Sequence, residues 1–278
     1  MASGTNILSY LNRDTPVHRL TGVTKLAVFL IWTIVCMVTY DTRVLLSALF
    51  LSITVFLIAK IRFSEVKTVL IFIGIFLLLN DITLYLFAPE QGVVIYGTRH
   101  VLFQFTSRYT VTQEQLFYLF NVTLKYFTTV PIALLFILMT DPSEFASSLT
   151  RLKVSYRVSY AVSITLRYLN DVQNDLHSIS QSQQARGIDL SRDAKLKDRV
   201  LGLAGIAIPL IFSSLDRIEL ISNAMDLRGF GKKDRRTWYC ERPMTKTDYF
   251  VIVMAALLCA IAIAVTLSNA GRYYNPFI

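Results

Sequence analysis

The chain has 278 residues, of which 54% are hydrophobic, with a mean hydropathy of +0.49 and a formal net charge of +9. Long apolar runs in such a composition are typical of membrane spans, which excludes an ordinary soluble domain. In a soluble protein this charge would favour an anionic partner, but in a membrane protein a basic excess on the cytoplasmic side accounts for it. We therefore expect a protein of the lipid bilayer, without a nucleic-acid partner.

The cysteine spacing and the N-terminal residues indicate whether to expect a disulfide framework, a metal site or a cleaved signal peptide. The three cysteines, Cys36, Cys240 and Cys259, are scattered and show neither a disulfide framework nor the spacing of a metal site. The stretch 1–20 is polar and lacks the apolar core of a signal peptide. We therefore expect no metal site and no cleaved leader.

Five segments are apolar and long enough to cross a bilayer, which takes about 20 helical residues. They are Thr24–Thr39, Val44–Ala59, Val69–Phe87, Leu116–Met139 and Tyr249–Leu267. The first two are short and form a hairpin through the turn YDTR, and Pro131 in the fourth is tolerated in a membrane helix. The pattern predicts an all-α polytopic membrane protein with about five transmembrane helices.

Lysine and arginine are distributed unevenly between the loops. Of the 28 basic residues, 17 fall within Thr140–Tyr249, whereas the loop Pro89–Gln115 holds only Arg99 and Arg108. The positive-inside rule therefore places the first region in the cytoplasm and the second outside. The basic N-terminal segment is then cytoplasmic, and five spans leave the C-terminus outside.

The chain divides into three predicted parts. Residues 1–139 hold the N-terminal segment and four transmembrane helices, residues 140–246 form a cytoplasmic coupling region with three helices, and residues 247–278 hold the last transmembrane helix and an external tail. The middle part opens with TDPSEF. Asp141 and Pro142 suit the cap and first position of a short helix that should run to about Leu152.

Two longer amphipathic helices follow in the middle part. In the first, apolar residues recur at steps of three and four, at Val162, Leu166, Leu169, Val172, Leu176 and Ile179. The second begins with the apolar stretch 200–212, which is too short to span a bilayer. It continues with one apolar face, formed by Ile211, Leu215, Ile218, Ile221 and Met225.

Each of these two helices ends in an Arg-Gly pair, in QQARGIDL (183–190) and in AMDLRGFG (224–231). Arginine is favourable at the negative end of a helix dipole, and glycine adopts the left-handed cap conformation, so capping is one interpretation. An exposed arginine also presents five N–H donors to carboxylates or carbonyls of a partner. Two such tips therefore predict two partner sites.

Motifs of catalysis are absent from the sequence. It contains no phosphate-binding loop, nucleophile elbow, zinc-protease motif or Cys-x-x-Cys, so the chain is not expected to be an enzyme. Asp81 and Lys125 are the ionisable residues well inside the predicted spans, and their similar depth predicts a possible intramembrane ion pair. The alternatives are an ion or substrate site and a Lys125 that snorkels outward.

Together these motifs resemble the transmembrane T component of energy-coupling factor (ECF) transporters, which are ABC-type importers of vitamins and metal ions. The two Arg-Gly segments are similar to the paired Ala-Arg-Gly motifs of that family, with Leu227 where alanine is usual. The stretches 140–169, 208–231 and 16–26 resemble its Asp-Pro-x-Glu opening, its Ile-Pro-Leu segment and its His-Arg-Leu segment. The resemblance covers essentially the whole chain.

The resemblance implies a role in coupling for the two helix ends. The residues that would dock on two ATP-binding ABC subunits are Ala185, Arg186, Gly187, Leu227, Arg228 and Gly229. It also implies a small membrane-embedded substrate-binding partner and a place in the bacterial plasma membrane. It implies no cofactor bound directly by this chain, because the partner subunits use the ATP.

Two other classes of function remain as alternatives. One is a self-contained permease, which would transport a substrate when the purified chain is placed in liposomes. The other is a membrane scaffold without a transport role, which would not co-purify with ATPases. The identity of the substrate, and whether its binding protein is dedicated or exchanged, stay open at this point.

The distribution of basic residues generates a test of topology. Cysteines introduced near Arg99 and near Asn275 should react with an impermeant thiol reagent added outside the cell, because both positions are predicted to be external. A cysteine near Lys195 should not react. Labelling at Lys195 from outside would overturn the predicted orientation.

Overall fold

The computed structural model describes residues 13–104, 109–187, 196–232, 237–238, 241–268 and 273–277. These residues are mainly α-helical, which confirms the prediction of an all-α polytopic membrane protein. The chain folds as two compact units. Residues 1–141 and 242–278 form the first, and residues 142–241 form the second.

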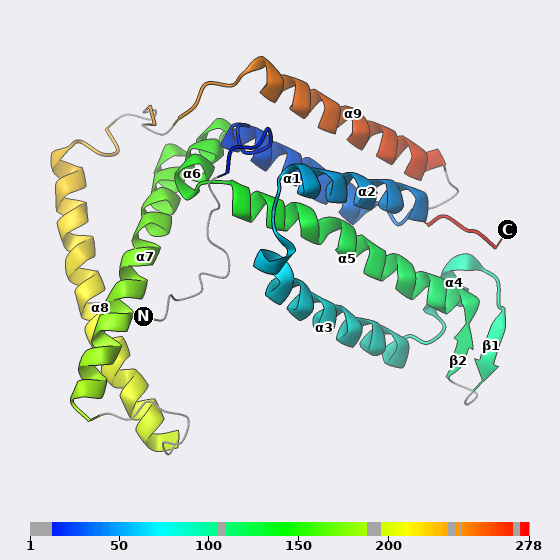
Figure 1. Cartoon of the computed structure of the whole chain (residues 1–278), viewed down its shortest axis with the longest axis horizontal. Helices are drawn as coiled ribbons and strands as arrows, with labels where there is room; N and C mark the ends of the chain where they lie inside the picture. The colour runs from blue at the N-terminus through cyan, green and yellow to red at the C-terminus, as the bar shows by residue number, and fades with distance from the viewer. Residues whose placement is uncertain are drawn as a thin grey trace. The chain divides into compact units, whose positions relative to one another are not determined.

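The first unit contains five long helices, which Figure 1 shows running alongside one another. They are α1 (Gly22–Val38), α2 (Thr42–Ile58), α3 (Phe63–Phe87), α5 (Gln113–Met139) and α9 (Lys246–Ser268). Helix α5 is the central one, because it packs against α1, α2 and α3, while α9 packs on α1 and, less extensively, on α2. α5 continues through Pro131, as expected for a membrane helix.

A segment that the sequence predicted only as an external loop has structure of its own. It contains the short helix α4 (Gln91–Tyr96) and the antiparallel strands β1 (Val101–Gln104) and β2 (Thr110–Thr112). Helix α4 lies so close to the start of α5 that a Cβ built on Gly92 would sit 2.4 Å from the carbonyl oxygen of Glu114. Only glycine permits this approach.

The helices α3, α5 and α9 are long and apolar enough to span a membrane, as predicted. Helices α1 and α2 have 17 residues each, the lower limit for a span. Within the second unit, the segment Val200–Leu227 of α8 (Leu196–Leu227) also meets the criterion of length and composition. The apolar residues of this segment lie in 200–212, and its charged residues follow them. Length and composition alone therefore do not place α8 in the membrane, and its cytoplasmic location stays a prediction.

Two buried lysines complete the ends of α1 and α5, which run antiparallel. Lys25, near the start of α1, donates through Nζ to the carbonyl oxygen of Met139, the last residue of α5, at 2.8 Å. Lys125 in α5 donates through Nζ to the carbonyl oxygen of Met37, in the last turn of α1, at 2.9 Å. Each helix thus supplies a cation to the negative end of the other, where carbonyls lack partners within their own helix.

The ring of Tyr40 completes the environment of Lys125, whose Nζ lies 3.6 Å from the ring centroid. This is the geometry of a cation–π interaction, which is strongest where water is excluded. Lys125 is 8% exposed. The lysine therefore does not snorkel outward; it is held inside the bundle by a carbonyl and an aromatic face.

The prediction of an ion pair between Asp81 and Lys125 is wrong, because the structure, which describes both residues, shows their side chains bound to different partners. Asp81 Oδ2 accepts a hydrogen bond from Thr123 Oγ1 at 2.7 Å, while Lys125 contacts Met37 and Tyr40. Residues 123 and 125 are about 200° apart around an α-helix, because each residue turns it by about 100°. Similar depth therefore did not bring the two charges to the same face of α5.

A buried carboxylate joins the first and last helices of this unit. Asp248 Oδ1 accepts hydrogen bonds from the backbone N–H of Thr21 at 2.9 Å and from the hydroxyl of Thr24 at 2.8 Å. Its Oδ2 accepts from the N–H and the hydroxyl of Thr245, at 2.8 and 2.6 Å. Because this carboxylate is fully buried and satisfied on both oxygens, it fixes the start of α9 against the start of α1.

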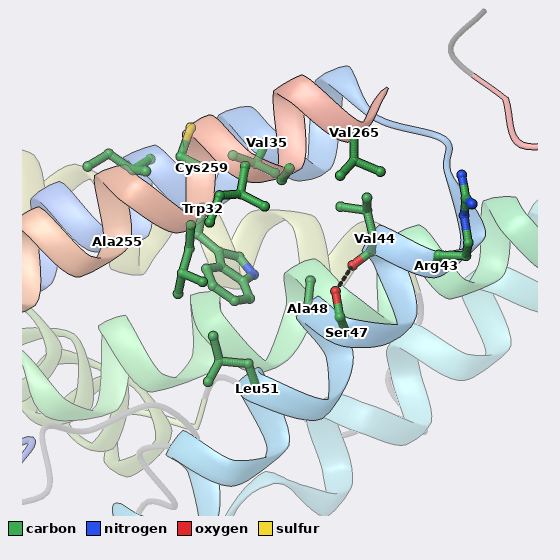
Figure 2. Close-up of a pocket in the computed structure, with 14 residues that line it drawn as sticks. Trp32, Val35, Arg43, Val44, Ser47, Ala48, Leu51, Ala255, Cys259 and Val265 are labelled. Carbon is green, nitrogen blue, oxygen red and sulfur yellow. Dashed lines mark hydrogen bonds between the residues drawn. The ribbon is translucent and has the colours of Figure 1, made fainter. Parts of the chain in front are cut away.

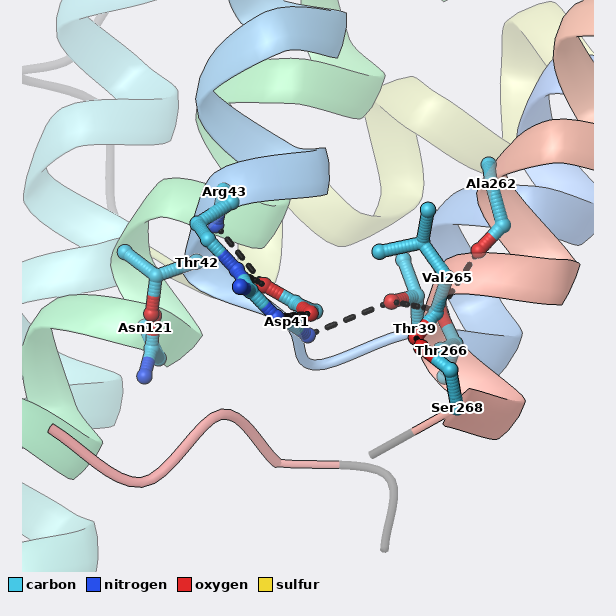
Figure 3. A network of polar contacts seen from close by, with 9 residues as sticks. All are labelled: Thr39, Asp41, Thr42, Arg43, Asn121, Ala262, Val265, Thr266 and Ser268. Carbon is cyan, nitrogen blue, oxygen red and sulfur yellow. Dashed lines mark hydrogen bonds and ion pairs between the residues drawn. The ribbon is translucent and has the colours of Figure 1, made fainter. Parts of the chain in front are cut away.

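At the opposite end of α1, polar side chains connect three helices (Figure 3). Thr39 shares a hydrogen bond with Thr266 of α9, with 2.8 Å between the hydroxyl oxygens. The buried Asp41 caps α2, since its Oδ1 accepts from the N–H of Arg43 at 2.9 Å. The turn between α1 and α2 is thereby tied both to α2 and to α9.

The C-terminal segment covers this same end of the unit with aromatic rings. Tyr96 of α4 packs edge-on against Tyr273 and Phe277, with ring centroids 6.1 and 5.8 Å apart. Its hydroxyl accepts a hydrogen bond from Asn121 Nδ2 at 3.2 Å, and burial raises the pKa of this phenol. Rings at the end of membrane helices are typical of a membrane interface.

The lysine contacts generate a prediction about stability. Lys125→Met should lower the free energy of unfolding by about 1–3 kcal/mol, because the carbonyl of Met37 is left buried without its donor. Thermal unfolding in detergent measures this effect. Lys67→Met is the matched control, because Lys67 is an exposed lysine of α3. Equal stability of the two variants would contradict the capping role.

The separate environments of Asp81 and Lys125 generate a second prediction. In a double-mutant cycle of Asp81→Asn and Lys125→Met, the two losses of stability should add to within about 0.5 kcal/mol, because the residues share no partner. The same unfolding measurement on the double variant provides the value. If the double variant is more stable than the less stable single variant, the result would contradict this structure and indicate that Asp81 and Lys125 do form an ion pair.

Candidate coupling site

The second unit contains the two helices that end in Arg-Gly, together with the short helix α6 (Pro142–Arg151). Helix α7 (Tyr156–Ala185) ends with Arg186 as its C-cap residue. Gly187 follows with φ at +86°, and its N–H donates to the carbonyl of Gln184 at 2.9 Å. The left-handed cap expected at this glycine is confirmed.

Helix α8 ends in the same way. Its last residue is Leu227, Arg228 follows as the cap, and Gly229 has φ at +65°. The N–H of Gly229 donates to the carbonyl of Asp226 at 2.9 Å, and that of Phe230 donates to the carbonyl of Met225 at 3.0 Å. This pair of bonds defines a Schellman motif, so both arginines stand at the same position of a glycine-terminated helix.

The residues at both tips are turned largely to the surface of the chain. Ala185, Arg186 and Gly187 are exposed, and so is Arg228. The side chain of Leu227 is 90% exposed, which is unusual for a large apolar residue. A guanidinium beside an uncovered leucine offers a charged and an apolar contact together, and such a surface suits a protein partner.

Helices α7 and α8 form an antiparallel pair (Figure 1). Arg217 of α8 forms an ion pair with Asp175 of α7, with 2.6 Å between Nη2 and Oδ2. Nearer the end of α7, Gln183 Nε2 donates to the carbonyl of Gly205 at 3.0 Å. These bonds fix the register of the pair along its length.

Four aromatic rings hold the other end of this pair. Tyr160 of α7 packs against Phe230 in a tilted arrangement, with ring centroids 4.8 Å apart, and the ring centroids of Tyr156 and Trp238 are 5.7 Å apart. Arg157 Nη2 also donates to the carbonyl of Gly231 at 3.4 Å. The segment that follows Arg228 is therefore packed against the start of α7.

The antiparallel register places the two arginine tips at opposite ends of the pair. Arg186 lies beside Gln183, which contacts Gly205. From Gly205 to Arg228, helix α8 advances about 35 Å at 1.5 Å per residue. One partner pocket cannot take both arginines at that separation, so the two tips suit two separate sites.

The apolar stripes of both helices are only partly covered within the chain. Leu169 and Leu176 of α7 are 52% and 47% exposed. On α8 the exposed apolar residues are Ile208, Ile211, Phe212, Leu215, Ile218 and Leu220. Exposed apolar residues along a helix stripe indicate a contact with another protein or with lipid.

Sequence reasoning found the tips but missed the contacts that position them. Asp175 and Arg217 form an ion pair, and nothing in their spacing along the chain pairs them. Arg151 and Glu241, which are 2.6 Å apart between Nη2 and Oε1, were missed for the same reason. Asp81 and Lys125 lie in the first unit and form no part of this site.

Comparison with known proteins gives one matching family. The family model for CbiQ, described as a cobalt transport protein, matches residues 13–239. An energy-coupling factor transporter transmembrane protein EcfT of Bacillus selenitireducens is 27% identical over 92% of this chain and 94% of its own length. EcfT of Bacillus subtilis is also 27% identical, over 91% of this chain and 94% of its own. EcfT of Exiguobacterium sibiricum is 29% identical over 66% of this chain and 70% of its own.

Proposed function

The chain belongs to the CbiQ family of cobalt transport proteins, and from this premise we propose that it is the coupling subunit of an ECF-type ABC importer. As a multi-pass transmembrane component it is not itself catalytic. It links ATP hydrolysis by two partner ATPases to the uptake of a vitamin or another micronutrient. A separate membrane-embedded protein binds that nutrient.

The observation that carries this proposal is the placement of Arg186 and Arg228. Both arginines follow the last residue of a helix, both precede a glycine with positive φ, and they lie at opposite ends of one antiparallel pair. A helix pair with an Arg-Gly terminus at each end is suited to engage two ATPase subunits at once. Movement of either subunit then acts on the whole pair, because Asp175–Arg217 and the aromatic cluster hold its two helices together.

The uncovered apolar surface of α7 and α8 supports a membrane-embedded partner. Residues such as Ile211 and Leu215 are about half exposed, although they belong to the apolar stripe. A substrate-binding protein with an apolar surface would bury them at a gain of roughly 25 cal/mol per Å². The coupling pair then touches both the ATPases, through its tips, and the substrate-binding protein, through its face.

The orientation inferred from the basic residues predicts that the second unit lies on the cytoplasmic side of the membrane, where ATP is present. The second unit corresponds closely to the lysine- and arginine-rich region between Thr140 and Tyr249. The chain itself uses ATP only through its partners. In this proposal its own contribution is mechanical, and the nutrient crosses with the substrate-binding protein.

Substitution of the arginines tests this proposal. Arg186→Ala or Arg228→Ala should strongly reduce transport and leave some ATPase bound, because truncating one side of a buried charge pair costs about 2–5 kcal/mol and the second tip still tethers the complex. The double variant should lose both ATPases and remain folded in the membrane. Co-purification of ATPases from membranes, together with uptake assays, provides the measurement.

Arg167→Ala is the matched control, because Arg167 is an exposed arginine in the middle of α7. It should leave ATPase binding unchanged. If the arginines act only as helix caps, each change costs about 0.3–1 kcal/mol of helix stability, and the ATPases stay bound in the double variant. Wild-type recovery of ATPases with the double variant would refute the proposed coupling site.

A further inference from the structure

Residues 273–277, here called the clasp, lie across the end of the first unit where α1 ends and α5 begins. Tyr273 pairs with Tyr40, in the turn between α1 and α2, through a parallel backbone bridge. Asn275 Nδ2 donates to the backbone carbonyl oxygen of Tyr96, in α4, at 2.9 Å. The clasp therefore joins two elements that are far apart in the sequence.

The sequence of the clasp, YYNPF, fixes its shape locally. Asn275 Oδ1 accepts a hydrogen bond from the backbone N–H of Phe277 at 3.0 Å, across Pro276. This is an Asx turn, in which the asparagine side chain takes the place of a backbone carbonyl and proline restricts the chain in between. The amide of Asn275 thus shapes the clasp with its oxygen and attaches it to α4 with its nitrogen.

Aromatic rings attach the clasp to further elements. The ring of Phe277 packs edge-on against Phe117 of α5, with centroids 5.8 Å apart, and its centroid lies 6.0 Å from that of His100, just before β1. The ring centroid of Tyr274 lies 4.1 Å from the guanidinium carbon of Arg43, at the start of α2. Arg43 also lines an apolar groove of about 320 Å³ between α1, α2 and α9 (Figure 2). The clasp is thereby seated on both α2 and α5.

Beneath the clasp lies the buried lysine that pairs with the end of α1. The ring of Tyr40 stacks on Tyr273, with centroids 4.7 Å apart, while Lys125 Nζ lies 3.6 Å from the centroid of the same Tyr40 ring. A ring and an ammonium cannot both lie so close over one face, so they occupy opposite faces of Tyr40. Cys36, which is 1% exposed, contacts the side chain of Thr129, one turn deeper in α5 than Lys125. Tyr273 is therefore the layer above Tyr40, and Lys125 and Cys36 lie below it.

We propose that the clasp is a detachable seal, which keeps water from Lys125 while it is closed and opens this end of the bundle when it detaches. A cation–π contact is strongest where water is excluded, so the hold of Lys125 on α1 depends on the ring layer above it. The clasp itself is held by ring packing and hydrogen bonds, and a segment held in this way opens at a lower free energy than the helices beneath it. The proposal concerns the first unit alone and does not depend on the ATPase contacts.

Alkylation of Cys36 in membrane fragments, which are open on both sides, measures this opening. Cys240→Ser and Cys259→Ser leave Cys36 as the only cysteine for a water-soluble maleimide. In this background Tyr273→Ala with Phe277→Ala should raise the rate of alkylation at least about ten-fold, because loss of ring packing increases the population of the open state. The unchanged clasp should keep the reaction slow.

Two controls separate a local opening from other effects. Tyr249→Ala with Phe87→Ala removes the same two kinds of ring from exposed positions and should leave the rate unchanged. Equal rates in the clasp variant and in this control would overturn the proposal. Val66→Cys, in a chain without the native cysteines, reports on the opposite end of the unit, where Val66 is fully buried near the last residues of α5. Equal acceleration there would show unfolding of the whole unit and would contradict a local seal.

A double-mutant cycle tests the link between the clasp and Lys125. If Tyr273 protects the contact of Lys125 with Tyr40, the double variant of Tyr273→Ala and Lys125→Met should lose less thermal stability than the two single variants together, because both changes disturb one arrangement. Tyr249→Ala in place of Tyr273→Ala should give additive losses. Additive losses in the first cycle would show that the clasp is a covering without influence on Lys125, and would refute the seal.

Discussion

The first unit depends on one constraint, which is that water is not present inside a bilayer to satisfy the ends of short helices. Helix α1 ends within the bundle, and the carbonyl of Met37 in its last turn is paired by Lys125. The end of α5 is paired by Lys25 in the same way. A buried carbonyl left without its donor costs about 1–3 kcal/mol. Pairing with a cation from the neighbouring helix is therefore a strong reason for α1 and α5 to adopt one relative height.

The remaining contacts of this unit build on that pairing. Because α5 is fixed against α1, it also provides the surface on which α2, α3 and α4 pack. Asp248 then fixes the start of α9 to the start of α1, and Thr266 fixes its other end through Thr39. The groove between α1, α2 and α9 follows from this arrangement, since α9 is held to α1 at both ends and only weakly to α2.

The second unit contains an antiparallel helix pair with an Arg-Gly terminus at each of its two ends. A single helix could carry an arginine at its end, but the negative pole and the glycine cap occur only once per helix. Two antiparallel helices give two such ends, one at each end of the pair. The ion pair of Arg217 with Asp175 and the packing of Tyr160 on Phe230 join the two helices of the pair.

The sequence by itself determined the features that depend on neighbours along the chain. The apolar lengths of α3, α5 and α9, the amphipathic stripes and the glycine caps at Gly187 and Gly229 all follow from local composition and spacing. Only the tertiary structure decided which side chains meet. Asp81 and Lys125 share a depth and still face different helices, because depth fixes the height of a residue on a helix and leaves its direction around the axis open. The same holds for the separation of the two arginine tips, which depends on α7 and α8 packing antiparallel in one register.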